Sequence, residues 1–305
     1  MIESLNNFLK KYNYKAGIIS FKRLKELENE IDGLYEGKYI DKSLYKSYLS
    51  GFLYNMKEDS FELKSIIIIA VPRPQNRIYF NTGKKCFPAI IPPTYIGQGR
   101  MDQKIKAILD WYLSGTGYMV LPARLPEKLL AAYSGLSRYG RNNISYIRDF
   151  GSFFYLTSFF SNIDCDYENW YEKKELEDCL DCKACLKNCP TGAITAKRFL
   201  LNAERCLTFF NEKPGNFPAW VKPESHNCLV GCMKCQIVCP YNEPFINWIE
   251  DTGEFTAEET EILLQNLPAE KLPSSIIEKL NFLDLQGYVG VIPRNLMALL
   301  KKESL

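Results

Sequence analysis

The cysteines of this chain follow a spacing that is typical of iron–sulfur proteins, and eight of its eleven cysteines are needed to complete the pattern. The first run, C-x2-C-x2-C-x3-C-P, consists of Cys179, Cys182, Cys185 and Cys189. In two-cluster proteins with this spacing, the fourth cysteine of a run binds the other 4Fe-4S cluster. The second run, Cys232, Cys235 and Cys239, needs one further cysteine from elsewhere in the segment. The two runs predict two 4Fe-4S clusters that exchange ligands and transfer single electrons.

Other interpretations of these cysteines explain the spacing less well. Disulfides are typical of secreted chains, whereas the residues that follow Met1 contain no basic region or apolar signal core. Zinc sites use C-x2-C pairs, but a long gap usually separates the first pair from the second. We therefore expect reduced thiolates in a cytoplasmic setting.

Composition narrows the classes of function. The chain has 305 residues, 46% of them hydrophobic, and a net charge of +2, which gives no global electrostatic argument for a nucleic-acid partner. The longest apolar run, residues 66–71, is too short to span a bilayer, so we expect no membrane partner. The single histidine, His226, excludes a catalytic pair of histidines and any metal site with several histidines.

The pattern of apolar residues predicts the elements that position the cysteines. Strand and helix patterns alternate over residues 15–160, which predicts a layered α/β domain at residues 1–164. A cysteine-rich domain at 165–250 and a helical tail at 251–305, packed back on the first domain, complete the expected division. The expected strands are 15–21, 65–72, 117–121 and 152–160. A further strand is expected at 78–80, paired beside 65–72. We expect helices at 1–13, 102–113 and 127–133, another beginning near Leu24, and a loop at 88–99.

Several segments together resemble the epoxyqueuosine reductase family, which comprises cobalamin-dependent iron–sulfur enzymes related to reductive dehalogenases. The longest is residues 135–160, GLSRYGRNNISYIRDFGSFFYLTSFF, and the others are the two cysteine runs, residues 203–208 and Arg294-Asn295. The resemblance implies an α/β (α+β) corrinoid-binding-type domain with an inserted ferredoxin-like double 4Fe-4S domain and a helical C-terminal tail.

The resemblance also implies a ligand set for each cluster. One cluster would be bound by Cys179, Cys182, Cys185 and Cys239, and the other by Cys189, Cys206, Cys232 and Cys235. Cys228 competes with Cys206 because C-x3-C is also a possible ligand spacing. We favour Cys206, whose Arg-Cys-Leu-Thr context matches the family. Cys86 and Cys165 have no partner at ligand spacing and are expected to be buried thiols.

For the corrinoid, the resemblance implies contacts with the loop Gly140, Arg141, Asn142 and Asn143 and with the turn Gly151-Ser152. Glycine permits close approach of the backbone to a flat macrocycle, and an asparagine amide can donate to its rim. A turn between a helix and a strand explains the same residues equally well.

One departure from the family concerns the proton donor. The family's catalytic aspartate falls at Leu121, and a leucine side chain cannot donate a proton. Tyr95 and Tyr118 are the candidate replacements, with Lys104 or Arg124 as the cation that would lower the phenol pKa.

The sequence therefore predicts a reductase whose clusters deliver electrons to a corrinoid, and whose corrinoid reduces an electrophilic small molecule or nucleoside. The expected electron donor is a ferredoxin or flavodoxin. One alternative is a non-catalytic electron-transfer or corrinoid-reducing protein. A second alternative is a tRNA epoxyqueuosine reductase with an altered proton donor.

Overall fold

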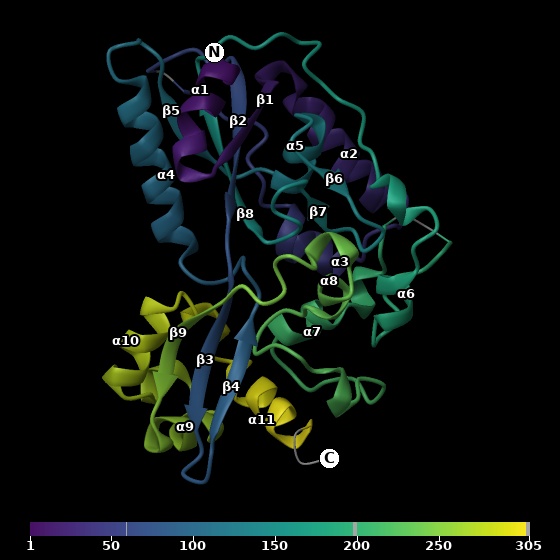
Figure 1. Ribbon diagram of the computed structural model, residues 1–305, viewed down its shortest axis with the longest axis vertical. Coiled ribbons are helices and arrows are strands. Elements are labelled where there is room, and N and C mark those ends of the chain that lie inside the picture. Colours follow the sequence, from purple (N-terminus) through teal and green to yellow (C-terminus); the bar gives the residue numbers. More distant parts are fainter. Residues whose placement is uncertain (59, 198–199, 303–305) are drawn as a thin grey trace. The chain divides into compact units, whose positions relative to one another are not determined.

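The computed structural model describes residues 1–58, 60–197 and 200–302, which form two compact units (Figure 1). Unit 1 contains Met1–Pro72 and Arg100–Lys183. Unit 2 contains Arg73–Gly99, Ala184–Lys197 and the residues from Glu204 onward.

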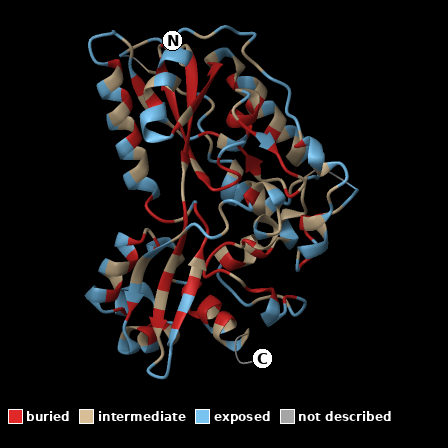
Figure 2. Ribbon diagram, in the orientation of Figure 1, coloured by how far each residue is buried: buried red, intermediate tan, exposed pale blue. Residues whose placement is uncertain are grey.

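Unit 1 is built on a four-stranded sheet in the order β1-β2-β8-β5, and all neighbouring strands are antiparallel. The strands are β1 (Lys15–Ser20), β2 (Ser65–Pro72), β5 (Val120–Ala123) and β8 (Phe154–Ser161). The inner strand β2 consists mostly of β-branched residues and is buried except at its last residue, Pro72; its buried part is red in Figure 2. A strand of this composition is expected where both faces of a sheet are covered.

Helices cover both faces of this sheet because successive side chains of a strand point to opposite sides. On one face, Ile66 and Ile68 pack with apolar residues of α2 (Leu24–Glu36) and α5 (Glu127–Tyr133). On the other face, Ile67 and Ile69 pack with α1 (Ile2–Leu9) and α4 (Gln98–Leu113). The short helix α3 (Lys42–Leu44) continues into a single π turn, Tyr45–Leu49. Unit 1 is thus a three-layer mixed α/β unit.

Unit 2 contains a three-stranded sheet in the order β4-β3-β9. Strand β3 (Gln75–Asn81) pairs antiparallel with β4 (Cys86–Ile91) and parallel with β9 (Ile249–Phe255). One apolar core joins this sheet to α9 (Ala257–Leu264), α10 (Ser274–Phe282) and α11 (Ile292–Lys302). The cysteine segment adds three short helices, α6 (Ala184–Asn188), α7 (Leu207–Glu212) and α8 (Lys234–Ile237).

Three expectations about elements were wrong. Residues 78–80 do not pair with β2, because β3 lies in the other sheet. Part of the expected loop 88–99 is strand β4, although the segment contains prolines. The C-terminal segment contains helices, but it also contributes strand β9, whose sequence IEDTGEF is mostly polar and gives no strand pattern.

The division into 1–164, 165–250 and 251–305 stays a prediction, and the compact units have other bounds. Residues 73–99 belong to unit 2 because β3 pairs with β9, so the C-terminal helices pack on β3 and β4. In the part of the chain that the structure describes, no helix is long and apolar enough to cross a membrane.

Candidate iron–sulfur centre

Five thiols of unit 2 that come from three separate segments lie close enough to influence one another's ionisation. They are Cys185, Cys189, Cys206, Cys232 and Cys235. Burial raises the pKa of Cys235 well above the ordinary thiol value, and the neighbouring Cys232, Cys206, Cys189 and Cys185 raise it further. Burial likewise raises the pKa of Cys232 to about 11, with smaller contributions from Cys206 and Cys189. The structure therefore brings together the four cysteines that the resemblance assigned to one cluster, with Cys185, which was assigned to the other cluster, beside them.

The donor set fits a 4Fe-4S cluster. Buried thiolates are unfavourable unless a positive partner offsets the loss of hydration, and iron ions supply that partner. Among the described residues, no three His, Cys, Asp or Glu side chains converge closely enough to bind a single metal ion. A four-iron cube takes one thiolate at each of four corners, so its ligands need not converge on one point. A bound cluster would supply one-electron redox chemistry here.

Hydrogen-bonding groups lie beside the sulfurs of Cys232, Cys206 and Cys189. The side-chain amide of Asn227 donates to the Cys232 sulfur at 3.2 Å, and the backbone of Lys234 donates to the same sulfur. Thr208 donates to the Cys206 sulfur through both its backbone and its side chain, and the Thr191 hydroxyl lies 3.6 Å from the Cys189 sulfur. Donors to ligand sulfurs are among the protein's means of tuning a cluster.

Cys206 and Cys228, the two candidates for the eighth ligand, have different surroundings, and the preference for Cys206 stays a prediction. Cys228 is fully buried, and its thiol donates to the Asn227 Oδ1 at 3.2 Å. Cys206 is among the thiols that raise the pKa of Cys235, whereas Cys228 lies near Cys232, which together with burial raises the pKa of Cys228 well above its ordinary value. Cys206 also stands at the N-terminus of α7, where backbone N–H groups point toward its sulfur.

The remaining four expected ligands are divided between the two units. Cys179 and Cys182 belong to unit 1, whereas Cys185 and Cys239 belong to unit 2. The ligand set of the other cluster therefore stays a prediction. Of the two cysteines expected to be plain buried thiols, Cys165 is half-buried, but Cys86 is exposed because it begins the outer strand β4.

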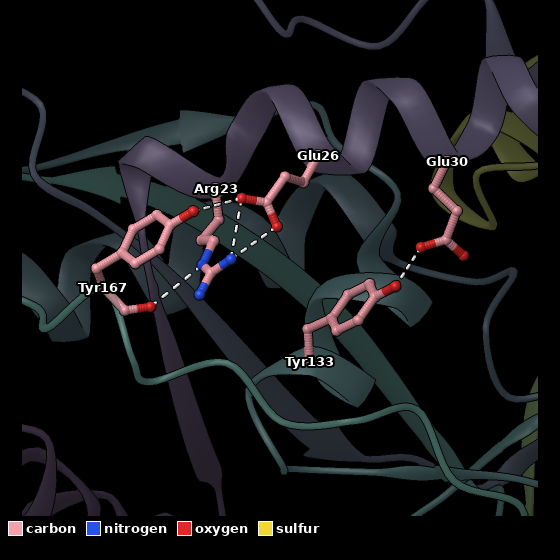
Figure 3. Close-up of polar contacts among 5 residues, drawn as sticks. All are labelled: Arg23, Glu26, Glu30, Tyr133 and Tyr167. Carbon is pink, nitrogen blue, oxygen red and sulfur yellow. Dashed lines mark hydrogen bonds and ion pairs between the residues drawn. The ribbon is translucent and has the colours of Figure 1, made fainter.

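The segment that leads to Cys179 is anchored on α2 by a group of polar and aromatic contacts (Figure 3). Arg23 donates to the backbone carbonyl of Tyr167 and to Glu26, and the Tyr167 hydroxyl donates to Glu26 at 2.7 Å. Farther along the helix, the Tyr133 hydroxyl donates to Glu30. Trp170 stacks on Tyr133 with ring centroids 3.8 Å apart. These contacts hold residues 167–170 beside α2 and α5, upstream of the first cysteine run.

Residues expected to face a corrinoid are engaged in contacts within unit 1. The loop joins β6 (Arg138–Tyr139) to β7 (Ser145–Tyr146). A Cβ at Gly140 would lie 2.6 Å from the Tyr146 ring, so only glycine fits there. Asn142 donates to the Tyr146 hydroxyl at 2.8 Å, and Arg141 donates to the carbonyl of Cys179 at 2.8 Å.

Two further positions in this region are explained by backbone conformation. Asn143 has a φ of +61° and Gly151 a φ of +56°, a region in which asparagine and glycine are the favoured residues. Ser152 is buried. The local fold thus accounts for these residue types by itself and gives no observation that fits a corrinoid; their role in binding one stays a prediction.

The candidate proton donors lie in different surroundings. Tyr95 is half-buried and donates its hydroxyl to the Glu212 carboxylate. Burial, followed by Glu212, raises the Tyr95 pKa well above its ordinary value, so this phenol holds its proton more tightly than a free one. Tyr118 is half-buried beside the core that α1 and α4 form. Leu121 lies in β5 opposite Phe160.

The two candidate cations, Lys104 and Arg124, are both exposed. The arrangement around Tyr95 is therefore the opposite of the cation–phenol pair that was expected, because a carboxylate accepts its proton.

A carboxyl group that sequence reasoning did not single out is Glu127, the first residue of α5. It is half-buried, and burial followed by the nearby Asp102 raises its pKa to about 8. The Asp102 carboxylate accepts from the Tyr155 hydroxyl at 3.0 Å. The sequence held no signal for this proximity, because Asp102 and Glu127 belong to separate helices.

Helix α11 holds the two halves of the cysteine segment together. The Asn295 amide donates to the carbonyls of Asn211 and Leu229, both at 2.8 Å, and Asn211 donates to the Gly231 carbonyl at 2.7 Å. Both asparagines are fully buried. Helix α7, which follows Cys206, is thereby fixed to the loop that precedes Cys232. His226 is also buried in this region, against the Phe217 ring, as a packing residue.

The fold and the gathered thiols define the class: a mixed α/β protein with an iron–sulfur domain. A family model for a 4Fe-4S double cluster binding domain matches residues 178–242. In sequence, the chain is 34% identical to the epoxyqueuosine reductase of Yersinia pestis over 135 residues, 44% of this chain and 31% of that protein. It is also 34% identical to the Escherichia coli enzyme over 121 residues, 39% of this chain and 31% of that protein.

Solved structures extend the likeness over nearly the whole chain. The epoxyqueuosine reductase of Bacillus subtilis superposes with a TM-score of 0.67 at 21% identity, over 98% of this chain and 81% of that one. The epoxyqueuosine reductase of Streptococcus thermophilus superposes with a TM-score of 0.66 at 18% identity, over 99% of this chain and 81% of that one. The predicted resemblance to the epoxyqueuosine reductase family is confirmed, and the fold is shared. The matched sequence spans about a third of the curated relatives' length.

Proposed function

We propose that this protein is an iron–sulfur oxidoreductase that passes single electrons through two 4Fe-4S clusters to a modified nucleoside in tRNA. The observation that carries the proposal is the gathering of the half-buried thiols Cys189, Cys206, Cys232 and Cys235 in unit 2. Because N–H groups donate to the sulfurs of Cys232 and Cys206, the site suits a group whose negative charge increases on reduction.

The substrate is proposed from the relatives. A solved epoxyqueuosine reductase, with a TM-score of 0.66 to this chain, was crystallised with an epoxyqueuosine-modified stem loop of tyrosine tRNA. This favours a tRNA substrate over the unidentified small molecule, and it outweighs the argument from a net charge of only +2. Removal of an epoxide oxygen as water consumes two electrons and two protons, so the clusters must deliver an electron twice. A ferredoxin or flavodoxin is the proposed source of these electrons.

The proton donor and the corrinoid are separate parts of the proposal. A corrinoid, when bound, would supply a nucleophilic metal centre. The raised pKa of Tyr95 makes it a weaker acid than a free phenol, which argues against Tyr95 as the proton donor. Turnover that is unchanged in Tyr95→Phe and Tyr118→Phe, singly and together, would remove both tyrosines from the mechanism.

The test begins with anaerobic reconstitution with iron and sulfide. We expect about eight irons per chain, as two cubane clusters require. Cys86→Ala is the matched control, because Cys86 is exposed and lies outside both cysteine runs, and it should keep the full iron content. Titration with cob(II)alamin, followed by electron paramagnetic resonance (EPR), tests the corrinoid. Reduction of an epoxyqueuosine-containing tRNA stem loop tests the activity.

Binding of the stem loop should weaken steeply with salt, because phosphate contacts release counterions. A salt-independent or absent interaction would contradict a tRNA substrate. The position of Leu121 favours the alternative of a non-catalytic electron-transfer protein. That alternative predicts about eight irons but no reduction of the stem loop with any chemical reductant.

A further inference from the structure

We infer that Asn227 sets the reduction potential of the cluster held by Cys189, Cys206, Cys232 and Cys235, through a hydrogen bond to the Cys232 sulfur. The inference rests on the proposed function, because it requires that these cysteines bind a cluster. It concerns a positioning and tuning residue rather than a catalytic one. Nothing in the cysteine spacing points to it, since Asn227 lies five residues before Cys232.

The neighbours of Asn227 determine the orientation of its amide. Its Oδ1 accepts from the backbone N–H of Met233 at 2.7 Å and from the thiol of Cys228 at 3.2 Å. A backbone N–H can only donate, so the oxygen must occupy that side of the amide. The Nδ2 is therefore turned toward the Cys232 sulfur, 3.2 Å away, and toward the carbonyl of Ser225 at 3.1 Å.

The environment makes this one bond strong. Met233 and Cys228 are fully buried, and Asn227 is only partly exposed, so water competes poorly for the donor. Two acceptor contacts and a second donor contact also hold the Asn227 side chain in place, so its donation to the sulfur costs little further conformational entropy. Cys228, which is not favoured as a ligand, thereby acquires a role as a support for Asn227.

The sign of the effect follows from charge. Reduction adds one electron to the cluster and increases the negative charge on its sulfurs. A donor to a sulfur therefore stabilises the reduced state more than the oxidised state and raises the reduction potential. Removal of the Asn227 N–H should lower the potential.

Asn227→Asp is the primary variant, because it keeps the size and the acceptor for Met233 while it removes the donor. We expect the equilibrium constant for one-electron reduction to fall about tenfold, which corresponds to 59 mV. Asn227→Leu removes the donor without adding charge and should lower the potential in the same direction. The midpoint potential is measured by an EPR-monitored redox titration, with iron content determined for each variant.

Asn188→Asp is the matched control. It makes the same substitution next to Cys189, but its amide donates to the Ala184 carbonyl and not to a sulfur. Its potential should stay near that of the wild type. If Asn227→Asp lowers the potential while Asn227→Leu does not, the added negative charge explains the shift and the inference is overturned. If neither variant changes the potential, the hydrogen bond does not set it, and the inference is overturned as well.

A measurement on the wild type covers the case in which both Asn227 variants lose their clusters. With asparagine labelled by 15N in the side chain, pulsed EPR of the reduced cluster should detect a 15N hyperfine coupling. Absence of that coupling would overturn the inference. Failure of the proposed function gives a different set of results. Either the wild type takes up no clusters, or the potential of the Asn227 variants shifts as expected although the wild type does not reduce the stem loop.

Discussion

Replacement of Glu127 by glutamine should make the stability of the protein less dependent on pH and raise it at neutral pH. Glu127 is half-buried at the start of α5, and no hydrogen bond to its carboxyl group is found among the described residues. Burial, and then the Asp102 carboxylate, raise its pKa from 4.5 to about 8. The native state thus holds this proton more tightly than the unfolded chain does.

The sign and the size follow from proton linkage. Between pH 4.5 and 8 the native state binds more protons than the unfolded state, so stability falls as pH rises. Below pH 4.5 both states are protonated and the penalty is absent. Each pH unit in this window costs about 1.4 kcal/mol, so ionisation of the unfolded chain costs the native state about 3 kcal/mol at pH 7. A buried glutamine amide without a partner has its own cost, so we expect a net gain of about 1–2 kcal/mol.

Thermal unfolding followed by circular dichroism from pH 5 to pH 8 measures this effect. The melting temperature of the wild type should fall relative to that of Glu127→Gln as pH rises, and the two curves should cross between about pH 5 and 6, because at lower pH only the cost of the buried amide remains. Glu258→Gln, an exposed carboxylate in the first turn of α9, is the control and should follow the wild type. Parallel curves for the wild type and Glu127→Gln would refute the reasoning.

Three further predictions concern the cluster segment and its supports. Cys206→Ala should reduce the iron content from about eight to about four per chain, whereas Cys228→Ala should leave it unchanged; the reverse result would exchange their roles. Asn295→Ala removes two buried hydrogen bonds and leaves their acceptor carbonyls unpaired. The free energy of unfolding, measured by denaturant titration, should therefore fall by about 2–4 kcal/mol, and a fall of less than about 1 kcal/mol would contradict this supporting role. Trp170→Ala removes the stack on Tyr133, so proteolysis of the segment before Cys179 should become faster; an unchanged cleavage rate would show that the stack does not anchor the segment.

The strands of unit 1 were predicted from the sequence, but the direction in which they pair was not. The run at Ser65–Pro72 predicted a buried strand, because a β-branched run between turn residues has few other favourable conformations, and the structure confirms it as β2. The alternation of strands and helices also predicted a mixed α/β unit correctly. It did not predict that all four strands of unit 1 pair antiparallel, since pairing direction depends on connections that a local pattern does not encode.

Strand β9 shows the limit of local patterns most directly. Its polar sequence satisfies no strand template, and it becomes a strand because the exposed backbone of β3 offers hydrogen bonds to it. That pairing joins residues 73–99 to the C-terminal segment, which no reading of either segment alone could foresee.

The sequence by itself determined the chemistry of this protein. Metal ligation depends on residue type and short spacing, so two cysteine runs sufficed to predict two 4Fe-4S clusters. Only the tertiary structure decided which residues surround those cysteines. Asn227 near Cys232, Glu212 against Tyr95 and Asp102 near Glu127 are all set by the packing of separate segments. The physical reason is that hydrogen bonds and charge–charge interactions depend on distance in space, which the order of residues along the chain does not specify.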